Sequence, residues 1–591
     1  MLPAWNLRDL YGSPSDNKLK RDRELISAAA ETFVRTNRGK ISDHARSPKR
    51  FLRALTQYES ILLQLAKPSI YAGLLFAEDA SNERHGAFLQ DTRHFASQVY
   101  NKLVFFELEI MALPQRTIKS LASAKSLSQY RNYLQKLIQQ KRHKLPEEQE
   151  TLVNDLSLTG AMAFVRLFDQ EFSHKQFDIK AGGKFRKVSE TEVLHLLSHE
   201  KRSTRKEALS SLVQGLKGDL WRLTFIFNTL AGSKQTMDRR RNFALPESAR
   251  HLDNEVEQKS VDALSSALQQ SYRLVQRYYK LKAKLLGLKD FQLYDRYAPL
   301  KGSQQRYTFE QARKMVVSAF GNFSSQLAKE ADNFFTKRWI DAAKRAGKRG
   351  GAFCSFGTPD LHPYIFINFQ GNLRDVFTLA HEMGHALHAC LMRGQNYLNY
   401  DAPLTICESA STFGEMLLFD KLRSESTAKG ELAALLAFKI DSIIATVYRQ
   451  ISMYLFEKDF HDLRRKKGEL SAAAISEIWQ KRQRQLYGSS VKLSPGSEVL
   501  WSYIPHFLHT PFYVYAYSYG QLLALIFFAR FKEEGSGFAR KLSHYYSLGS
   551  SKNPGEALKD IGVNLNSSAV WKQGIDIIEQ LVGELTVLSR K

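Results

Sequence analysis

Apolar residues recur at spacings of three and four along much of the chain, and this pattern predicts helices. The pattern is clearest in four stretches: residues 151–172, 190–230, 255–286 and 309–346. The clearest strand signal is the β-rich run YIFINF at residues 364–369, and residues 350–356 are its predicted pairing partner. The sequence therefore predicts a mainly α fold that contains one small β-sheet.

A chain of 591 residues is too long for one hydrophobic core of ordinary size, so at least two lobes are expected. The glycine-rich, polar stretch around Gly182 has the composition of a junction. We therefore predict an N-terminal helical lobe over residues 1–185 and a larger domain over residues 186–591. The sequence shows no short-period repeat and no long low-complexity linker, so the lobes are expected to pack closely.

The cysteines and the apolar runs bear on the cellular compartment. Cys354, Cys390 and Cys407 are too few and too scattered for a disulfide framework, which indicates a reducing environment. The N-terminal residues do not have the pattern of a secretory signal. The longest apolar run, residues 522–529, is far shorter than the ~20 residues of a membrane helix. We expect a cytoplasmic protein that does not insert into membranes.

The net charge of +25 is the unusual bulk property of the chain. It could indicate nucleic acid, an acidic membrane surface or acidic substrates as partners. The basic clusters are short, are separated by stretches with Asp and Glu, and lack the interleaved aromatic residues on which bases stack. This distribution favours a solvated basic surface, so no nucleic-acid partner is expected.

The string HEMGH, which begins at His381, lies within a helical pattern over about residues 373–392. Residues four apart share one face of a helix, so the imidazoles of His381 and His385 can bind the same ion. Asn372 and Gly394 are suited to cap and to end this helix. A catalytic zinc ion takes three protein ligands and keeps a fourth position for water, so a third ligand is required downstream.

The third ligand is an acidic residue that follows the HEMGH helix. The spacings of other zinc peptidase classes would place it at residues that do not fit: Leu391, Leu404 and Thr405. Asp401 and Glu408 remain. Asp401 lies in a loop just before a proline, whereas Glu408 begins a segment that could form a second helix, so Glu408 is favoured. The motif then reads HExxH, 22 residues, Glu.

Three further residues near these ligands have predicted roles. Glu415 lies two turns beyond Glu408 on the same face, where it could accept a hydrogen bond from a ligand imidazole. His388 is either a buried, hydrogen-bonded histidine or a residue with a direct role. Cys390 is expected to pack rather than to bind metal.

Around these residues the sequence resembles the oligoendopeptidase F group of the thimet-oligopeptidase-like M3 metallopeptidases. The similarity extends over nearly the whole chain. The matching segments are WNLRDLYGS, KLKAKLLGLKDFQLYDRYAPL, GKRGGAFCSFGTPDLHPYIFINFQG, DVFTLAHEMGHALH, ESASTFGE, IPHF and NPGEALKDIGVNL. Gly414 departs from this pattern, because relatives tend to carry Asn there.

The resemblance implies a helical fold whose two halves enclose a deep channel with one Zn²⁺ per chain. The channel would admit unstructured oligopeptides, and the residue 186–591 domain would be catalytic. The resemblance also implies that IFINF is an edge strand that pairs with substrate backbone, with Phe366 and Asn368 as substrate contacts.

The resemblance further implies that a segment rich in histidine and tyrosine completes the site. His506 matches this segment well, and Tyr517 is the best match for the phenol that stabilises the transition state. Tyr513 and Tyr515 are candidate substrate contacts. The alternative for any of these tyrosines is packing in the core.

These assignments predict a zinc endopeptidase in which Glu382 is the general base. Two alternatives stay open. One is a nucleic-acid-binding or scaffold protein with a structural zinc, which would need a fourth protein ligand. The other is a carboxypeptidase, which would need a buried cation for the substrate carboxylate. The sequence does not indicate an oligomeric state.

Overall fold

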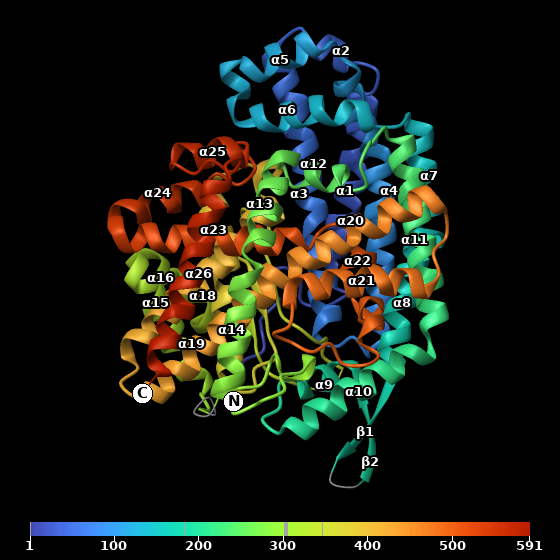
Figure 1. Ribbon diagram of the computed structural model, residues 1–591. Coiled ribbons are helices and arrows are strands. Elements are labelled where there is room, and N and C mark those ends of the chain that lie inside the picture. Colours follow the sequence, from blue (N-terminus) through green and yellow to red (C-terminus); the bar gives the residue numbers. More distant parts are fainter. Residues whose placement is uncertain (1, 182–183, 301–304, 346, 591) are drawn as a thin grey trace. The chain divides into compact units, whose positions relative to one another are not determined.

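The computed structural model describes residues 2–181, 184–300, 305–345 and 347–590. Most of these residues are helical (Figure 1), which confirms the mainly α class. The chain forms two compact units, each built from three stretches of sequence: unit 1 from residues 1–151, 306–421 and 530–563, and unit 2 from residues 152–305, 422–529 and 564–591. The predicted boundary after residue 185 falls within the first stretch of unit 2 and stays a prediction.

Unit 1 has a core of aliphatic and aromatic side chains that includes Phe33, Tyr58 and Phe106, whose rings are in contact. The longest helix in this core, α3, could cross a membrane by length and composition alone, but its buried side chains pack into the core. The helices of unit 1 are α1 (Asn17–Asn37), α2 (Ile41–His44), α3 (Pro48–Glu78), α4 (Glu83–Ala112), α5 (Gln115–Ser123), α6 (Arg131–Gln140), α15 (Phe309–Phe323), α16 (Ser325–Thr336), α17 (Leu373–Leu391), α24 (Ser536–Ser547) and α25 (Pro554–Asp560).

Unit 2 is also helical. Its helices are α8 (Ala161–His174), α9 (Glu190–Leu196), α10 (Arg202–Gly218), α11 (Leu220–Arg240), α12 (Ser248–Asp253), α13 (Gln258–Gln270), α14 (Tyr272–Leu285), α19 (Lys429–Ile443), α20 (Gln450–Lys467), α21 (Ala472–Tyr487), α22 (His506–His509) and α26 (Ser568–Leu588). Three helices contain a boundary between the units: α7 (Glu147–Thr159), α18 (Leu404–Glu425) and α23 (Tyr515–Glu534).

The stretch predicted as a junction forms a β-hairpin. Strands β1 (Gln176–Ala181) and β2 (Lys184–Ser189) pair antiparallel, with Phe177 opposite Val188. Gly182 and Gly183, at the centre of the predicted junction, lie outside the described residues. The alternation of apolar and polar residues on both sides of the glycine pair was the signal for this hairpin.

The second sheet lies in unit 1 and consists of β3 (Ile340–Asp341), β4 (Phe353–Ser355) and β5 (Tyr364–Phe366). The order is β3-β5-β4, and the antiparallel pairing of β5 with β4 confirms the predicted partners. The prediction of helix from residue 309 to 346 is wrong at its end, because the chain leaves α16 through Arg338 at φ 58° and continues as β3. Ala346 lies outside the described residues.

Candidate metal centre and active site

Helix α17 carries the HEMGH string and is fixed at both ends. At its start the Asn372 side chain accepts a hydrogen bond from the Asp375 N–H, and the Asp375 carboxylate accepts one from the Asn372 N–H. This capping box satisfies N–H groups that the first turn leaves without partners. After Leu391 the chain continues as a 3₁₀ turn that ends at Gly394, as predicted. The buried face of α17 includes Val376 and Ala380.

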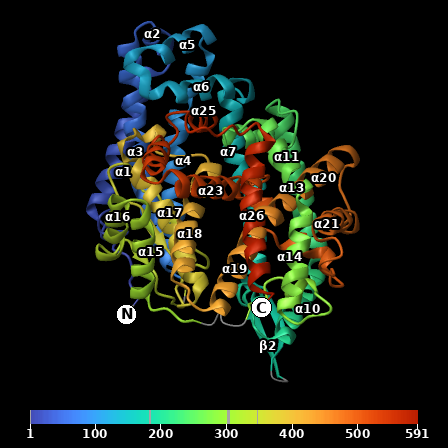
Figure 2. The same ribbon diagram turned by 60° about the vertical axis from the view of Figure 1, so that its left-hand side comes forward.

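Helix α18 lies beside α17 (Figure 2), and the two backbones meet at glycines. A Cβ atom on Gly384 would lie 2.6 Å from the carbonyl oxygen of Ala410, and one on Gly414 would lie 2.8 Å from that of Ala380. Side chains at these two positions are therefore excluded by backbone. This contact lets Glu408 approach the histidines of α17. Spacing and periodicity alone do not predict this contact, although a glycine in each of two neighbouring helical segments is a signal for it.

Gly384→Ala is expected to lower the free energy of unfolding by about 1–3 kcal/mol, because the added methyl group meets backbone atoms that cannot yield. It is also expected to weaken metal binding, because α18 and Glu408 must move away. Chemical denaturation and metal titration measure the two effects. The control is Gly73→Ala in α3, where no heavy atom lies within 4 Å of the added Cβ. Equal stability of the two variants would contradict the proposed contact.

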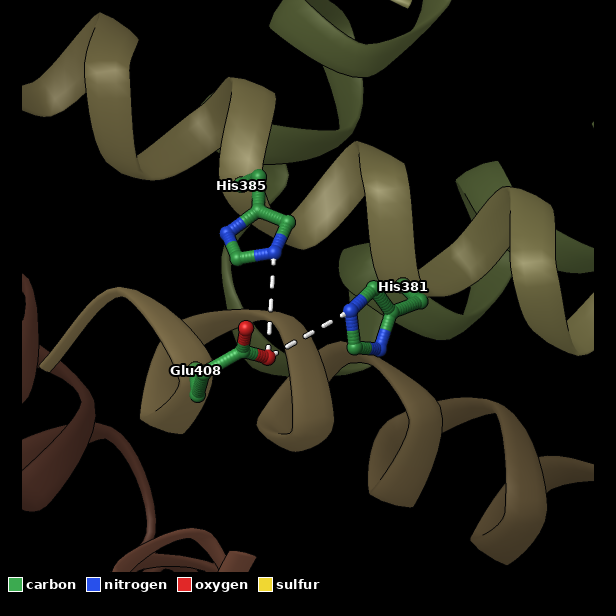
Figure 3. A group of neighbouring side chains, drawn as sticks. All are labelled: His381, His385 and Glu408. Carbon is green, nitrogen blue, oxygen red and sulfur yellow. Dashed lines mark ion pairs between the residues drawn. The ribbon is translucent and has the colours of Figure 1, made fainter. Parts of the chain in front are cut away.

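The three predicted ligands come together between α17 and α18 (Figure 3). Glu408 Oε2 lies 3.6 Å from His381 Nε2 and 3.9 Å from His385 Nε2. One possible ligand atom from each residue lies within 4.8 Å of the others. Two imidazole nitrogens and one carboxylate oxygen form a donor set of catalytic zinc sites, and ligands of one zinc ion lie about 3–4 Å apart. The residues therefore fit a divalent cation.

Asp401, the alternative third ligand, is not part of this group. Its carboxylate accepts a hydrogen bond from the backbone N–H of the next residue, Ala402, at 2.8 Å. Glu408 is 7% exposed and lies in the first half of α18, where the helix holds its carboxylate beside the imidazoles. The geometry therefore favours Glu408 over Asp401 as the third ligand.

Glu415 lies two turns beyond Glu408 and accepts a hydrogen bond from His381 Nδ1 at 2.8 Å. This bond selects the tautomer of His381 whose Nε2 is available as a ligand. Burial lowers the pKa of His381, but the Glu415 hydrogen bond and the charges of Glu382, Glu415 and Glu408 outweigh it and raise the pKa to about 9. The carboxylates thus favour positive charge here, and a metal cation would take the place of that proton.

Glu382 follows His381 on α17 and is 6% exposed. Burial raises the pKa of its carboxyl group to about 7; the charge of His381 opposes this shift, and the charges of Glu408 and Glu415 add to it. A carboxyl group with a pKa near neutrality can both accept and return a proton. This is the property that a general base in hydrolysis needs.

A second cluster of predicted residues lies in unit 2, where α22 meets the start of α23. His506 Nε2 lies 3.3 Å from the Tyr517 hydroxyl oxygen. The Tyr513 ring stacks parallel to the His506 ring and meets the Tyr517 ring edge to face. Burial, with a contribution from the charge of Arg449, lowers the pKa of His506 to about 4. The imidazole is therefore neutral at pH 7, with one donor and one acceptor nitrogen.

Tyr515 lies apart from this cluster. Its side chain is fully buried, its hydroxyl accepts a hydrogen bond from the Asn254 amide at 2.8 Å, and His251 Nδ1 lies 3.0 Å away. The prediction that Tyr515 contacts substrate is therefore wrong. Residues two apart point to opposite sides of a helix, so Tyr515 faces the core on the side away from Tyr517.

Known proteins match the chain over its full length. A family model described as Peptidase family M3 matches residues 195–577, and one described as Oligopeptidase F matches residues 109–177. The first match covers most of the chain, including both helices of the metal centre. The chain belongs to peptidase family M3. It is therefore a metallopeptidase, and the resemblance found in the sequence is confirmed.

Individual relatives of this M3 peptidase agree with the family models. An oligoendopeptidase F homolog of Lactococcus lactis is 27% identical over 601 residues, which span 100% of this chain and 97% of the relative. The oligopeptidase PepF of Bacillus subtilis is 23% identical, over 100% of this chain and 87% of the relative. The crystal structure of oligoendopeptidase-F from Enterococcus faecium superposes with a TM-score of 0.74 at 21% identity, covering 97% of this chain and 99% of that one. The fold is thus shared from end to end.

The small sheet of this M3 peptidase differs from the expectation. Strand β5 is the middle strand, paired on both sides, so the prediction that it is an edge strand is wrong. Phe366 is fully buried and stacks on Phe353, so it does not offer a substrate contact. The Asn368 side chain donates hydrogen bonds to the carbonyl oxygens of Arg349 and Gly351. These bonds hold the loop before β4, which is an outer strand of the sheet.

His388 is 2% exposed and packs against the rings of Tyr546 and Phe356. Burial lowers its pKa to about 4, so its imidazole is neutral. These contacts agree with the interpretation of His388 as buried. Both ring nitrogens are buried without a hydrogen-bond partner among the described residues, so the hydrogen bond that this interpretation included stays a prediction. Cys390 is partly exposed, and desolvation raises the pKa of its thiol. Its expected packing role stays a prediction.

Proposed function

We propose that this M3 peptidase is a zinc-dependent endopeptidase that hydrolyses internal peptide bonds of oligopeptides. The supporting observation is that His381, His385 and Glu408 bring their donor atoms within 4.8 Å of one another, with Glu382 next to His381 on α17. The relatives named oligoendopeptidase F support oligopeptides as the substrate class.

His381, His385 and Glu408 would hold one Zn²⁺, which when bound supplies a Lewis acid that polarises a carbonyl group and lowers the pKa of water. Glu382 accepts the proton of the attacking water and then delivers it to the departing amine. The raised pKa of Glu382 suits both transfers, since the group must be a base first and an acid afterwards. Glu415 keeps His381 in the tautomer that presents Nε2.

We assign His506 and Tyr517 as hydrogen-bond donors to the oxygen that becomes negative in the transition state. Donors that are fixed before the reaction stabilise such a charge most effectively. The assignment is supported by the resemblance and by the contact between the two side chains, which orients the phenol against a neutral imidazole. The Tyr513 ring packs against the rings of both His506 and Tyr517, and Tyr513 is a candidate substrate contact.

Tyr517→Phe is expected to lower kcat by about 10²–10³-fold, the usual cost of removing one donor to a developing oxyanion, with little change in stability. The matched control is Tyr515→Phe. That change leaves the Asn254 amide without its acceptor, so it should lower the free energy of unfolding by about 1–3 kcal/mol and leave kcat nearly unchanged. Steady-state kinetics and chemical denaturation of both variants test the assignment. The reverse pattern would contradict it.

Terminally blocked peptides separate an endopeptidase from a carboxypeptidase. We expect the purified protein to cut a mixture of such peptides at internal bonds, to lose this activity on chelation and to regain it with Zn²⁺. Mass spectrometry of the products identifies the cut bonds. If only peptides with a free C-terminus are shortened, one residue at a time, the endopeptidase proposal fails. If chelation has no effect, the metal proposal fails.

We assign the substrate-pairing edge to β4 rather than β5. An exposed strand edge binds an extended peptide through main-chain hydrogen bonds, and β4 is an outer strand of its sheet. The ring of Phe356, one residue after β4, lies 6.4 Å from the ring of His385, which supports this edge as the one next to the metal ligands. The backbone of β4 would align the bond to be cut.

We further propose that the protein works in the cytoplasm. The support is chemical: Cys354, Cys390 and Cys407 are all free thiols, as expected in a reducing compartment. The proposed partners are oligopeptides alone, with the excess of basic residues serving as a solvated surface rather than as a nucleic-acid site.

A further inference from the structure

Two arginines of unit 2 lack the partner that a buried guanidinium usually has. Arg296 and Arg449 are only partly exposed, and both line the same cavity. Within the described residues, no carboxylate forms an ion pair with either guanidinium. The charge of Arg296 acts unfavourably on Arg449, and the side-chain groups to which the two guanidiniums donate are tyrosine hydroxyls. Two cations that share a cavity without an anion are unfavourable unless a ligand supplies the negative charge.

The carboxylate nearest in sequence is already occupied. Asp295 precedes Arg296 and is fully buried, and it accepts hydrogen bonds from Arg202 and Arg205. The Asp295 carboxylate also accepts a hydrogen bond from the backbone N–H of Gln292. Asp295 is therefore neutralised by Arg202 and Arg205, and none of the ion pairs among the described residues joins it to Arg296.

Most N–H donors of the two guanidiniums have no acceptor in the described residues. Each guanidinium carries five N–H donors. Arg449 donates to the hydroxyl oxygens of Tyr297 and Tyr503, at 3.4 and 3.2 Å. Arg296 donates to the carbonyl oxygen of Leu293 and to the Tyr487 hydroxyl. The remaining N–H groups belong to side chains that line the cavity, so a ligand there could accept hydrogen bonds from them.

A third donor belongs to the same cavity. Gln483 lines it and is 6% exposed, and its amide nitrogen has no hydrogen-bond partner in the structure. A buried donor without an acceptor costs about 1–3 kcal/mol, so native proteins rarely keep one without a ligand or a water. Gln483 lies on α21, whereas Arg449 ends the π-helical turn η6 (Ile444–Arg449). π-Helical turns of this kind are often found at functional sites.

The cavity is small. Its free volume is about 20 Å³, which exceeds the ~10–15 Å³ that one water molecule requires. Trp479 and Ser497 also line it, and none of the described residues in its lining is acidic. A single small anion, or one carboxylate group, therefore matches the cavity in size and in charge.

The geometry points to a binding site for one small anion between Arg296, Arg449 and Gln483, distinct from the metal centre. The ligand of this site is a compact oxyanion or a halide. It is either a free inorganic ion or a carboxylate group of a bound peptide. Arg449 is close enough for its charge to act on His506, so an occupant would change the electrostatics of the proposed oxyanion donor. The anion site does not depend on the proposed function, but the alternative in which a peptide carboxylate occupies it rests on that function.

The free-ion source is tested by thermal unfolding of the full chain in sodium bromide and in sodium acetate. Every variant is measured in the same salt series, so a general effect of ionic strength appears in all of them and a specific rise appears only where the site is intact. We expect either salt to raise Tm by about 2 °C or more as its concentration passes from well below to well above its Kd. The rise should vanish in Arg449→Gln and persist in Arg277→Gln, an exposed arginine of the same unit that is paired with Glu579.

The peptide-carboxylate alternative is tested with two matched pairs of peptides. One pair differs in a free or amidated C-terminus, and the other differs in a Glu or Gln residue. We expect KM of the acidic form to rise about tenfold in Arg449→Gln, the usual order for the loss of a charge-assisted hydrogen bond, with no change for the neutral form. Gln483→Leu removes a hydrogen-bond donor of the site without removing a charge. It serves as the test variant if Arg449→Gln does not fold. The site is overturned if the wild type shows neither the Tm dependence nor the KM difference, or if the effect that it shows is unchanged in both variants. Absence of all peptide cleavage would instead refute the proposed function and leave the Tm test valid.

Discussion

Exchanging Glu382 for glutamine is expected to lower kcat by about 10²–10⁴-fold, the range that general acid–base catalysis contributes, while the protein keeps its fold and its metal. Glutamine has nearly the same shape as glutamate, but its amide cannot take a proton from water. Glu382 is also not among the three ligand residues, so metal affinity should persist. Hydrolysis of an internally quenched peptide gives kcat, and atomic absorption gives the metal content.

Glu310→Gln serves as the control for this experiment. Glu310 lies on α15 in the same unit, and its side chain is 58% exposed, so the same chemical change there should leave kcat and metal content as in the wild type. A Glu382→Gln variant with nearly normal turnover would show that another group activates the water. A variant that loses its metal as well would show that Glu382 acts on the site's structure rather than as a base.

The metal centre could be predicted from sequence because its geometry is mostly local. His381 and His385 are one helical turn apart, so the spacing alone directs both imidazoles to one point. Glu408 was harder, since 22 residues separate it from His385. It was chosen because Asp401 lies in a loop, and the structure agrees: α18 carries Glu408 to the imidazoles, and Glu415 follows on the same face.

The features that the sequence did not show depend on contacts between distant segments. The family resemblance implied that β5 is an edge strand, and no sequence pattern indicated its second partner, β3, which is only two residues long. Tyr515 could not be separated from Tyr517 until the start of α23 was known, because the direction of each ring depends on the helical register. The arginines of the anion site have no motif, since what distinguishes them is that no carboxylate of the described residues pairs with them or lines their cavity.

Glu408→Ala is expected to abolish metal binding at micromolar metal and, with it, peptide hydrolysis. Loss of a partner that only orients a ligand costs about 10–100-fold in metal affinity, and loss of a ligand itself should cost more. The two imidazoles that remain cannot hold the ion in the required geometry. Zinc stoichiometry and competition with a chromogenic chelator measure the loss, and circular dichroism reports whether α17 and α18 persist.

Asp401→Ala is the matched control, because Asp401 is the other acidic residue that the spacing allowed. Its carboxylate accepts from the backbone N–H of Ala402 and stands outside the ligand group. The variant should therefore keep its zinc and its activity, with at most a small loss of stability. If Asp401→Ala loses the metal and Glu408→Ala keeps it, then the ion is bound by a different set of residues, and the proposed chemistry of Glu382 and Glu415 must be abandoned with it. If both variants lose zinc in proportion to a loss of helical signal, the effect is on folding, and Glu408→Gln, which preserves the shape of the side chain, decides the role of the charge.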